Sequence, residues 1–132
     1  MRLLLDSSAC IAAMRDRPRG ARRRILGQGE FVISTIVLAE LEFGLALSSQ
    51  KEANRIALDS LLDMVAVEPW TDEAARRFGS LRAELQTAGR LIGPYDLLIA
   101  AHALALGLPL MTGNLREFRR VPGLEVLPIP AR

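Results

Sequence analysis

The sequence predicts a single α/β domain with a short, mostly parallel sheet of four or five strands and helices on both sides. Short runs that are apolar throughout, such as residues 2–5 and 30–33, alternate with longer segments of helical spacing. Strands that are apolar on both faces are typical of parallel sheets covered on each side. The 132 residues, 50% hydrophobic and 24% charged, suit one domain over residues 1–132 and exclude intrinsic disorder.

The first half of the chain predicts a β-α-α-β unit followed by two more helices. Pro18 separates the first two helices, Gly27 ends the second, and Ser34 is the expected N-cap of the third. The expected elements are a strand over residues 2–5, helices over 8–15 and 19–27, a strand over 30–33, and helices over 35–47 and 52–64.

The second half predicts two long helices among three short strands. Asp72 and Glu73 suit the positive end of a helix dipole, Pro94 suits a first helical position, and Gly107 is a stop signal. The expected elements are a strand over residues 65–67, a helix over 72–88, a loop over 89–93, a helix over 95–106, and strands over 108–111 and 124–127, with prolines 128 and 130 ending regular structure.

Composition excludes several classes of protein. The single cysteine, Cys10, forms no intrachain disulfide and supplies no Cys/His metal site, which fits a reducing compartment. The most apolar stretch, residues 97–111, contains His102 and Pro109 and is too short to span a bilayer. Asp6 interrupts the N-terminal apolar run before a signal peptide develops. We therefore expect a cytoplasmic protein with no membrane segment.

The positive charge is almost entirely arginine. Of the 17 Lys and Arg residues only Lys51 is lysine, although the net charge is just +2, and six arginines crowd between residues 15 and 24. Guanidinium groups bind phosphates bidentately, so this cluster can follow a nucleic-acid backbone. A solvated helix face explains it equally well. No aromatic residue lies in the cluster, which argues against base stacking there.

Three acidic residues lie at strand or helix positions where a carboxylate has either a structural or a functional role. Asp6 follows the first strand directly, at the sheet edge where ligands bind, although it also suits an N-cap. Glu40 lies within the apolar segment 36–41 and needs either a cation or an arginine partner. Asp96 falls in the first turn after Pro94, where the helix dipole favours it. Spacing alone does not bring the three together.

Carboxylates that do converge on one sheet edge repel one another unless a cation neutralises them. Their hard oxygens suit Mg²⁺ or Mn²⁺, and such a site can support metal-assisted hydrolysis of phosphodiester bonds. An aspartyl-phosphate receiver or phosphatase built on Asp6 is a weaker alternative. Those proteins carry further acids beside the nucleophile and a placed lysine, whereas Ser7 and Ser8 are neutral and Lys51 is the sole lysine.

Four ordered motifs closely resemble the PIN-domain ribonucleases, especially the VapC toxins of bacterial type II toxin-antitoxin systems. They are LLDSS at residues 4–8, IST with LAEL and a glycine at 33–44, IGPYDLLIAA at 92–101, and MTGN with EF and VPGL at 111–124. The resemblance covers essentially the whole chain and implies a PIN-like fold. It implies that Asp6, Glu40 and Asp96 form an acidic Mg²⁺ or Mn²⁺ site, with Thr112 and Asn114 on its far side.

The resemblance also implies partners: an RNA substrate, a small cognate antitoxin whose C-terminal segment lies along a groove, and a second copy in a homodimer. Part of that groove would come from the apolar helices between residues 35 and 64.

This sequence departs from the family pattern at several positions. Members often carry asparagine or threonine after the first aspartate, where this chain has two serines, and many have asparagine or a smaller residue where it has Tyr95. Some members carry a fourth acid where this chain has Asn114. The number of metal ions that bind, one or two, therefore stays open, and Glu117 is a candidate replacement for the missing acid. Tyr95 either stacks on an RNA base or packs at the helix start, and packing is favoured. His102 is expected to be a core or interface histidine rather than a metal ligand.

The leading hypothesis is a metal-dependent endoribonuclease. Asp6 and Asp96 would bind the ion, Glu40 would bind it or orient the attacking water, and Thr112 with Asn114 would hold ligand waters or phosphate. The arginines between residues 15 and 24 would attract RNA. The alternative is a degenerate PIN domain that binds RNA or a protein partner without cleavage, as the neutral Asn114 suggests.

Overall fold

Five parallel strands form the central sheet in a computed structural model that describes residues 1–130. In sheet order the strands are β3 (Ala66–Glu68), β2 (Glu30–Ser34), β1 (Arg2–Leu5), β4 (Leu110–Thr112) and β5 (Val126–Pro128). The central strand β1 pairs Leu3 with Phe31 of β2 and Leu5 with Met111 of β4. The predicted α/β class is confirmed, and the sheet is entirely parallel.

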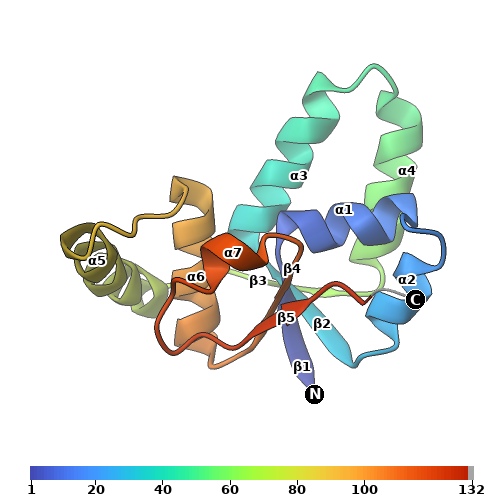
Figure 1. Ribbon diagram of the computed structural model, residues 1–132. Coiled ribbons are helices and arrows are strands. Elements are labelled where there is room, and N and C mark those ends of the chain that lie inside the picture. Colours follow the sequence, from blue (N-terminus) through green and yellow to red (C-terminus); the bar gives the residue numbers. More distant parts are fainter. Residues whose placement is uncertain (131–132) are drawn as a thin grey trace.

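Seven helices in the described residues connect and cover the strands. They are α1 (Ser7–Arg15), α2 (Ala21–Leu26), α3 (Thr35–Leu47), α4 (Lys51–Leu62), α5 (Asp72–Thr87), α6 (Pro94–Leu106) and α7 (Leu115–Phe118). Figure 1 shows α3 and α4 as a hairpin that projects away from the sheet, with α5 and α6 as a second pair on the other side of the molecule. None of the described helices is both long and apolar enough to cross a membrane.

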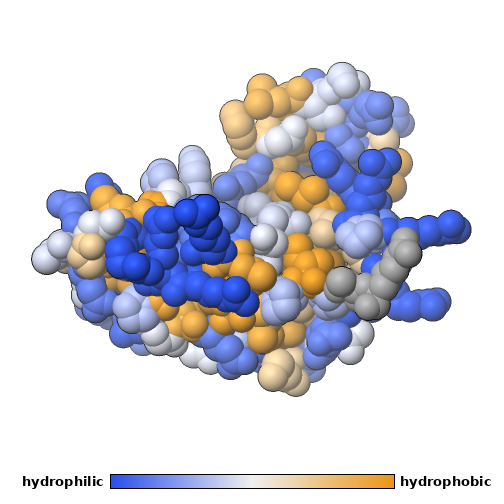
Figure 2. Space-filling view, viewed as in Figure 1, coloured by the Kyte–Doolittle hydropathy of each residue, from blue (hydrophilic) through white to orange (hydrophobic). Residues whose placement is uncertain are grey.

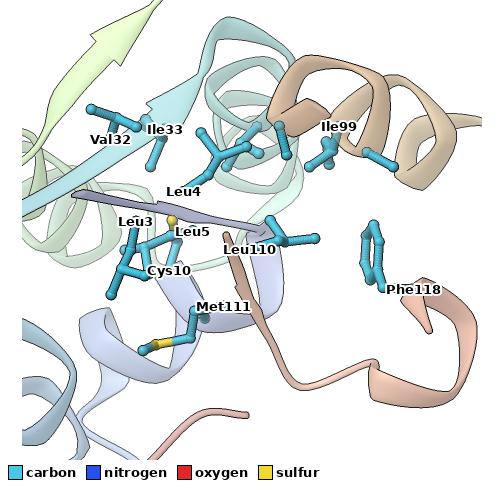
Figure 3. Close-up of a cluster of buried hydrophobic side chains, with 14 of the residues drawn as sticks. Leu3, Leu4, Leu5, Cys10, Val32, Ile33, Ile99, Leu110, Met111 and Phe118 are labelled. Carbon is cyan, nitrogen blue, oxygen red and sulfur yellow. The ribbon is translucent and has the colours of Figure 1, made fainter. Parts of the chain in front are cut away.

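The core lies on both faces of β1. Leu4 points to one face, toward Ile33 and Ile99, whereas Leu3 and Leu5 point to the other, toward Cys10 and Met111 (Figure 3). All three leucines are almost completely buried, and each such side chain contributes about 1.5–3 kcal/mol to folding. Because the central strands are buried on both faces, their apolar runs were readable from the sequence.

The edge strands were harder to place. β3 begins at Ala66 and β5 at Val126, one and two residues later than predicted, and β4 is shifted in the same direction. Ala66 and Val67 are exposed, so burial on both faces does not mark the bounds of an edge strand. Pro128 is the last residue of β5 and tolerated there because an edge strand needs fewer N–H donors.

Three helices also differ from prediction. α4 ends at Leu62, two residues before its predicted end. α2 begins only at Ala21, because the preceding Gly20 adopts φ +86°, a left-handed conformation that a helix excludes. The four-residue α7 was not predicted at all, since a single turn is too short to show periodicity. This short helix nevertheless buries Phe118 against the sheet and carries residues of the candidate site.

Candidate metal centre

Asp6 sits where the chain leaves β1 and enters α1. Its backbone is extended, and its side chain is buried. Oδ1 accepts hydrogen bonds from Ser8 Oγ at 2.6 Å and from the N–H of Ala9 at 2.9 Å, while Oδ2 accepts from the Thr112 hydroxyl. Asp6 is therefore the N-cap of α1 as well as a carboxylate at the sheet edge. Burial raises its pKa, although these hydrogen bonds act in the opposite direction.

Thr112 and Asn114 reach the same edge from the end of β4. Thr112 is completely buried and lies behind Asp6, and its Oγ1 accepts a hydrogen bond from the N–H of Asn114 at 2.9 Å. The N–H of Gly113 donates to Ser8 Oγ at 2.9 Å, which ties this loop to α1. Thr112 thus supports Asp6, whereas Asn114 is exposed and faces the remaining acids.

Glu40 projects from α3 and is half-buried. Its Oε1 accepts a hydrogen bond from Ser7 Oγ at 2.6 Å. The arginine salt bridge weighed from the sequence is not found among residues 1–130, so a hydroxyl provides the compensation instead. Glu42 lies on another side of α3, is exposed as expected, and pairs with Arg55 at 2.8 Å.

Asp96 lies in the first turn of α6. Its two polar neighbours are Glu117 of α7 and Asn114, the residue that precedes α7. Asn114 Nδ2 donates to Asp96 Oδ2 at 3.3 Å and to Glu117 Oε2 at 2.9 Å. Glu117 Oε1 accepts from the N–H of Gly93. Glu117 therefore joins the acids as the fourth carboxylate, which the sequence offered only as a candidate replacement for Asn114.

The acids influence one another electrostatically. The pKa of Asp96 is raised to about 7, first by burial, then by the charge and hydrogen bond of Glu117, and further by the charges of Asp6 and Glu40. The N–H of Gly93 is the largest cause that lowers the pKa of Glu117, so Asp96 is the weaker acid of the two. Buried Cys10 on α1 also has a raised pKa, chiefly through burial and then through the charges of Asp6 and Glu40. Four carboxylates thus contribute to one negative region.

The acids are gathered but not preassembled as metal ligands. Among residues 1–130, no three acidic, histidine or cysteine side chains already stand at the mutual spacing of a metal-binding group. Each carboxylate is instead turned toward hydroxyl, amide or N–H donors of its own neighbourhood, as expected for like charges that repel. The hard oxygen donors fit Mg²⁺ or Mn²⁺, and so do the negative charges that, after burial, raise the pKa of Asp96.

Two further residues of the sequence motifs lie in contrasting surroundings. His102 is completely buried in α6, with Nδ1 2.8 Å from Ser34 Oγ, which confirms its prediction as a core histidine. The prediction that Tyr95 packs at the helix start was wrong, because its side chain is 56% exposed. Tyr95 follows Pro94 in the first turn of α6, before that helix becomes buried.

Sequence reasoning underrated two residues of this site. Ser7 was considered only as a neutral neighbour of Asp6, yet it holds Glu40. Glu117 stands three residues after Asn114, which is one helical turn, and that spacing was the available signal. Using it required α7, whose single turn leaves no periodic pattern.

Comparisons with known proteins agree with this architecture. Residues 3–124 match the PIN domain family. The tRNA(fMet)-specific endonuclease VapC of Shigella flexneri is 38% identical over 126 residues, covering 95% of this chain and 96% of the relative. Ribonuclease VapC2 of Rickettsia felis is 36% identical over 124 residues, covering 92% of each.

Solved structures are similar as well. The VapBC2 structure from Rickettsia felis, bound to a DNA fragment from its promoter, has a TM-score of 0.90 at 34% identity and covers 97% of this chain and 98% of that one. The DNA-bound VapBC of Salmonella typhimurium has a TM-score of 0.89 at 35% identity, covering 98% and 99%. Matches of this extent, on a parallel sheet that gathers acids at its carboxyl edge, mean that the chain belongs to the PIN-domain family and is VapC-like.

Proposed function

We propose that this chain is a metal-dependent endoribonuclease, the toxin of a toxin-antitoxin module, and that it hydrolyses RNA at the acidic edge of its sheet. The observation that supports this most is the convergence of carboxylates from separate elements, Asp6 after β1, Glu40 on α3 and Asp96 on α6, with Glu117 of α7 beside them. The relatives named as ribonucleases, which span nearly the same length, support the same function.

In this proposal Asp6, Glu40 and Asp96 hold Mg²⁺ or Mn²⁺, with Glu117 as a fourth acid. The bound ion would lower the pKa of a water molecule and stabilise negative charge on the departing oxygen. Glu40 orients the attacking water and accepts its proton, while Ser7 fixes the direction of its carboxylate. Asp96 must release its proton to bind the ion, which Asn114 assists by donating to the ionised carboxylate.

Thr112 and Asn114 take different roles. Thr112 is a positioning residue, because it is buried and its hydroxyl donates to Asp6. Asn114 is exposed beside Asp96 and is placed to hold a ligand water or a substrate phosphate.

The test uses purified protein freed of any antitoxin. It should cleave a structured RNA in Mg²⁺ and stop when EDTA is added, and Asp96→Asn should reduce cleavage about 100-fold or more because a metal ligand is lost. Asp63→Asn is the matched control, since Asp63 is an exposed carboxylate between α4 and β3, at the amino edge of the sheet. Cleavage by Asp96→Asn at the wild-type rate would overturn the assignment.

Binding without cleavage is the alternative function. Its motivation was the neutral Asn114, but Glu117 restores a carboxylate beside that position. Calorimetry separates the two functions. A pure binding module should bind RNA with the same affinity in the presence and absence of Mg²⁺, and the Glu40→Gln variant should bind RNA as tightly as wild type.

The partner we propose for the apolar side of the site is a segment of a small antitoxin. A cleft of about 170 Å³ lies between α1, α3 and α4, with mostly apolar walls and with Arg15 and Glu40 in its lining. An occupant of this cleft would lie beside a catalytic acid. The two similar solved structures described above are VapBC structures, which supports an antitoxin as the occupant.

Gly44 gives a direct test of that partner. It lines the cleft, and a Cβ there would meet no atom within 4 Å. Gly44→Leu should therefore fill the cleft without disturbing α3 and should weaken binding of the antitoxin encoded beside this gene. Gly79→Leu is the control, because Gly79 of α5 is equally open and lies outside the cleft. Unchanged antitoxin affinity of Gly44→Leu, measured by calorimetry, would assign the antitoxin to another surface.

Homodimer formation also stays a proposal. The α3–α4 hairpin exposes Phe43, Leu47 and Ile56, each at least 66% exposed, and Figure 2 shows apolar surface over its outer end. Light scattering on the antitoxin-free protein, compared with Phe43→Ser, measures whether this surface joins two copies.

A further inference from the structure

A second group of arginines lies beside the acidic edge, on a part of the chain that the sequence did not single out. We call Arg90, Arg116, Arg119 and Arg120 the α7 arginine surface. Arg90, Arg116 and Arg119 are exposed and Arg120 is half-buried. Figure 2 shows a strongly hydrophilic area over α7 and its immediate surroundings.

The turn that carries Glu117 also orients these arginines. Arg116 lies in α7, and Arg119 and Arg120 follow its last residue directly, while Glu117 of the same turn binds Gly93 and Asn114. Arg120 Nη1 donates to the Leu91 carbonyl at 3.0 Å. This bond and the Glu117–Gly93 bond hold α7 against the segment that begins with Arg90 and leads into Tyr95.

The positive charge of this surface is not neutralised by ion pairs. The ion pairs among residues 1–130 involve only Arg2 and Arg55. The guanidinium groups at positions 90, 116 and 119 therefore remain available to an outside anion. These arginines lie close to carboxylates that repel a polyanion. Their positive charge can attract a phosphate backbone to the site despite that repulsion.

Tyr95 adds an aromatic ring to this surface. It directly precedes Asp96, and it is 56% exposed, with Leu91 also 41% exposed on the same connecting segment. An exposed ring next to guanidinium groups is the arrangement that binds single-stranded nucleic acid, because bases stack on the ring and phosphates pair with arginine.

The arginines between residues 15 and 24 are a poorer match to the site. Arg22 donates to Ser60, and Arg24 donates to the carbonyl of Arg19, so two of them support the fold. The cluster follows the far end of α1, about 12 Å along the helix from the serines that contact the acids.

We propose that the α7 arginine surface and Tyr95 bind the single-stranded RNA that flanks the cleaved bond, with phosphates on the arginines and one base stacked on Tyr95. This inference rests on the proposed ribonuclease function and assigns residues outside the acidic site that contact the RNA strand. A double helix cannot place a base on Tyr95 without opening, so the contact with Tyr95 requires an unpaired base.

The test measures RNA binding separately from cleavage. A short fluorescein-labelled RNA, either single-stranded or as its duplex, is titrated with antitoxin-free protein in Ca²⁺ by fluorescence anisotropy at several salt concentrations. Tyr95→Ala should weaken single-strand binding about tenfold, and Tyr95→Phe should keep it, because only the ring is needed. Duplex binding should not respond to Tyr95→Ala. Arg116→Ala/Arg119→Ala should reduce the slope of log affinity against log salt by about 1.4, since each phosphate contact contributes about 0.7.

Two control variants locate the effect. Arg19→Ala/Arg23→Ala removes two arginines from the other cluster, and Arg76→Ala removes one from α5, about 16 Å along that helix from its end at Thr87. Thermal melting checks that each variant is folded. The inference is overturned if Tyr95→Ala binds single strands like wild type, or if the Arg19/Arg23 pair changes the salt slope more than the Arg116/Arg119 pair. Failure of wild type to cleave RNA in Mg²⁺ would instead overturn the proposed function.

Discussion

Asp96 and Glu117 are neighbouring carboxyls whose surroundings shift their pKa values in opposite directions. Glu117 accepts the backbone N–H of Gly93 and an amide N–H of Asn114, and both donors stabilise its charge. Asp96 is half-buried, which disfavours its charge most, and it also faces three negative neighbours and accepts a longer bond from Asn114. The pKa of Asp96 therefore rises while that of Glu117 falls.

This arrangement predicts that stability without metal falls as pH rises. The pKa of Asp96 is about 7 in the folded state against 3.8 as the ordinary value, so between these pH values the folded chain binds more protons than the unfolded chain. The contribution of Asp96 to the free energy of unfolding therefore decreases with pH across this window. Asp96→Asn should stabilise the protein at pH 8 by about 1–2 kcal/mol, allowing for the partial exposure of the carboxyl, and have little effect at pH 4.

Urea denaturation in EDTA at the two pH values measures this difference. The exposed Asp63→Asn serves as the comparison, since it removes one carboxylate at the other edge of the sheet. Equal effects of Asp96→Asn at pH 4 and pH 8 would show that Asp96 ionises at its ordinary pKa.

Individual site residues were predictable when a strong local rule marked them. Asp6 ends an apolar strand and Asp96 follows a helix-starting proline, so their positions were readable without a structure. Hydrogen bonds between distant segments were not, because the Ser7–Glu40 and Thr112–Asp6 contacts join residues 33 and 106 positions apart. The exposure of Tyr95 was missed for a similar reason, since it depends on how α6 meets its neighbours.

At the scale of elements, predictability followed burial and length. The bounds of α3 agree with the prediction, because Ser34 caps it and its apolar spacing is regular. α5 agrees within a residue, with Thr71 accepting the N–H of Ala74 as its N-cap. The half-exposed edge strands and the single-turn α7 lack a periodic signal, so their positions depend on tertiary contacts.

Two glycines with equally open surroundings should respond in opposite directions to alanine. A Cβ at Gly79 or at Gly107 would meet no atom within 4 Å. Gly79 lies inside α5, where alanine should raise the free energy of unfolding by about 0.5–1 kcal/mol. Gly107 ends α6 at φ +68°, where a side chain costs about 1–2 kcal/mol. Urea denaturation of both variants gives the comparison, and a shared sign would contradict the backbone explanation.

At the scale of the whole molecule, the strand order places the acids together. The chain proceeds from β1 through β2 to β3 on one side, then returns to add β4 on the other side of β1. The connections after β1 and β4 therefore diverge at the carboxyl edge and leave a crevice, the usual ligand position in such sheets. Asp6 follows β1 and Thr112 ends β4, so the two residues flank this point.

A sheet that gathers repelling carboxylates should be stabilised as a whole by a divalent cation. Binding to the folded state alone adds about 2.7 kcal/mol at a ligand concentration one hundred times Kd, so Mg²⁺ should raise the melting temperature of wild type by several degrees. Asp96→Asn should be more stable than wild type in EDTA at pH 8 and yet gain less from Mg²⁺, because it removes both the repulsion and a ligand. Differential scanning calorimetry measures both the stability of Asp96→Asn relative to wild type in EDTA and the gain of each protein from Mg²⁺. NaCl at matched ionic strength is the control. If NaCl reproduces the Mg²⁺ shift in wild type, screening of surface charge explains the stabilisation and the acidic edge does not hold an ion.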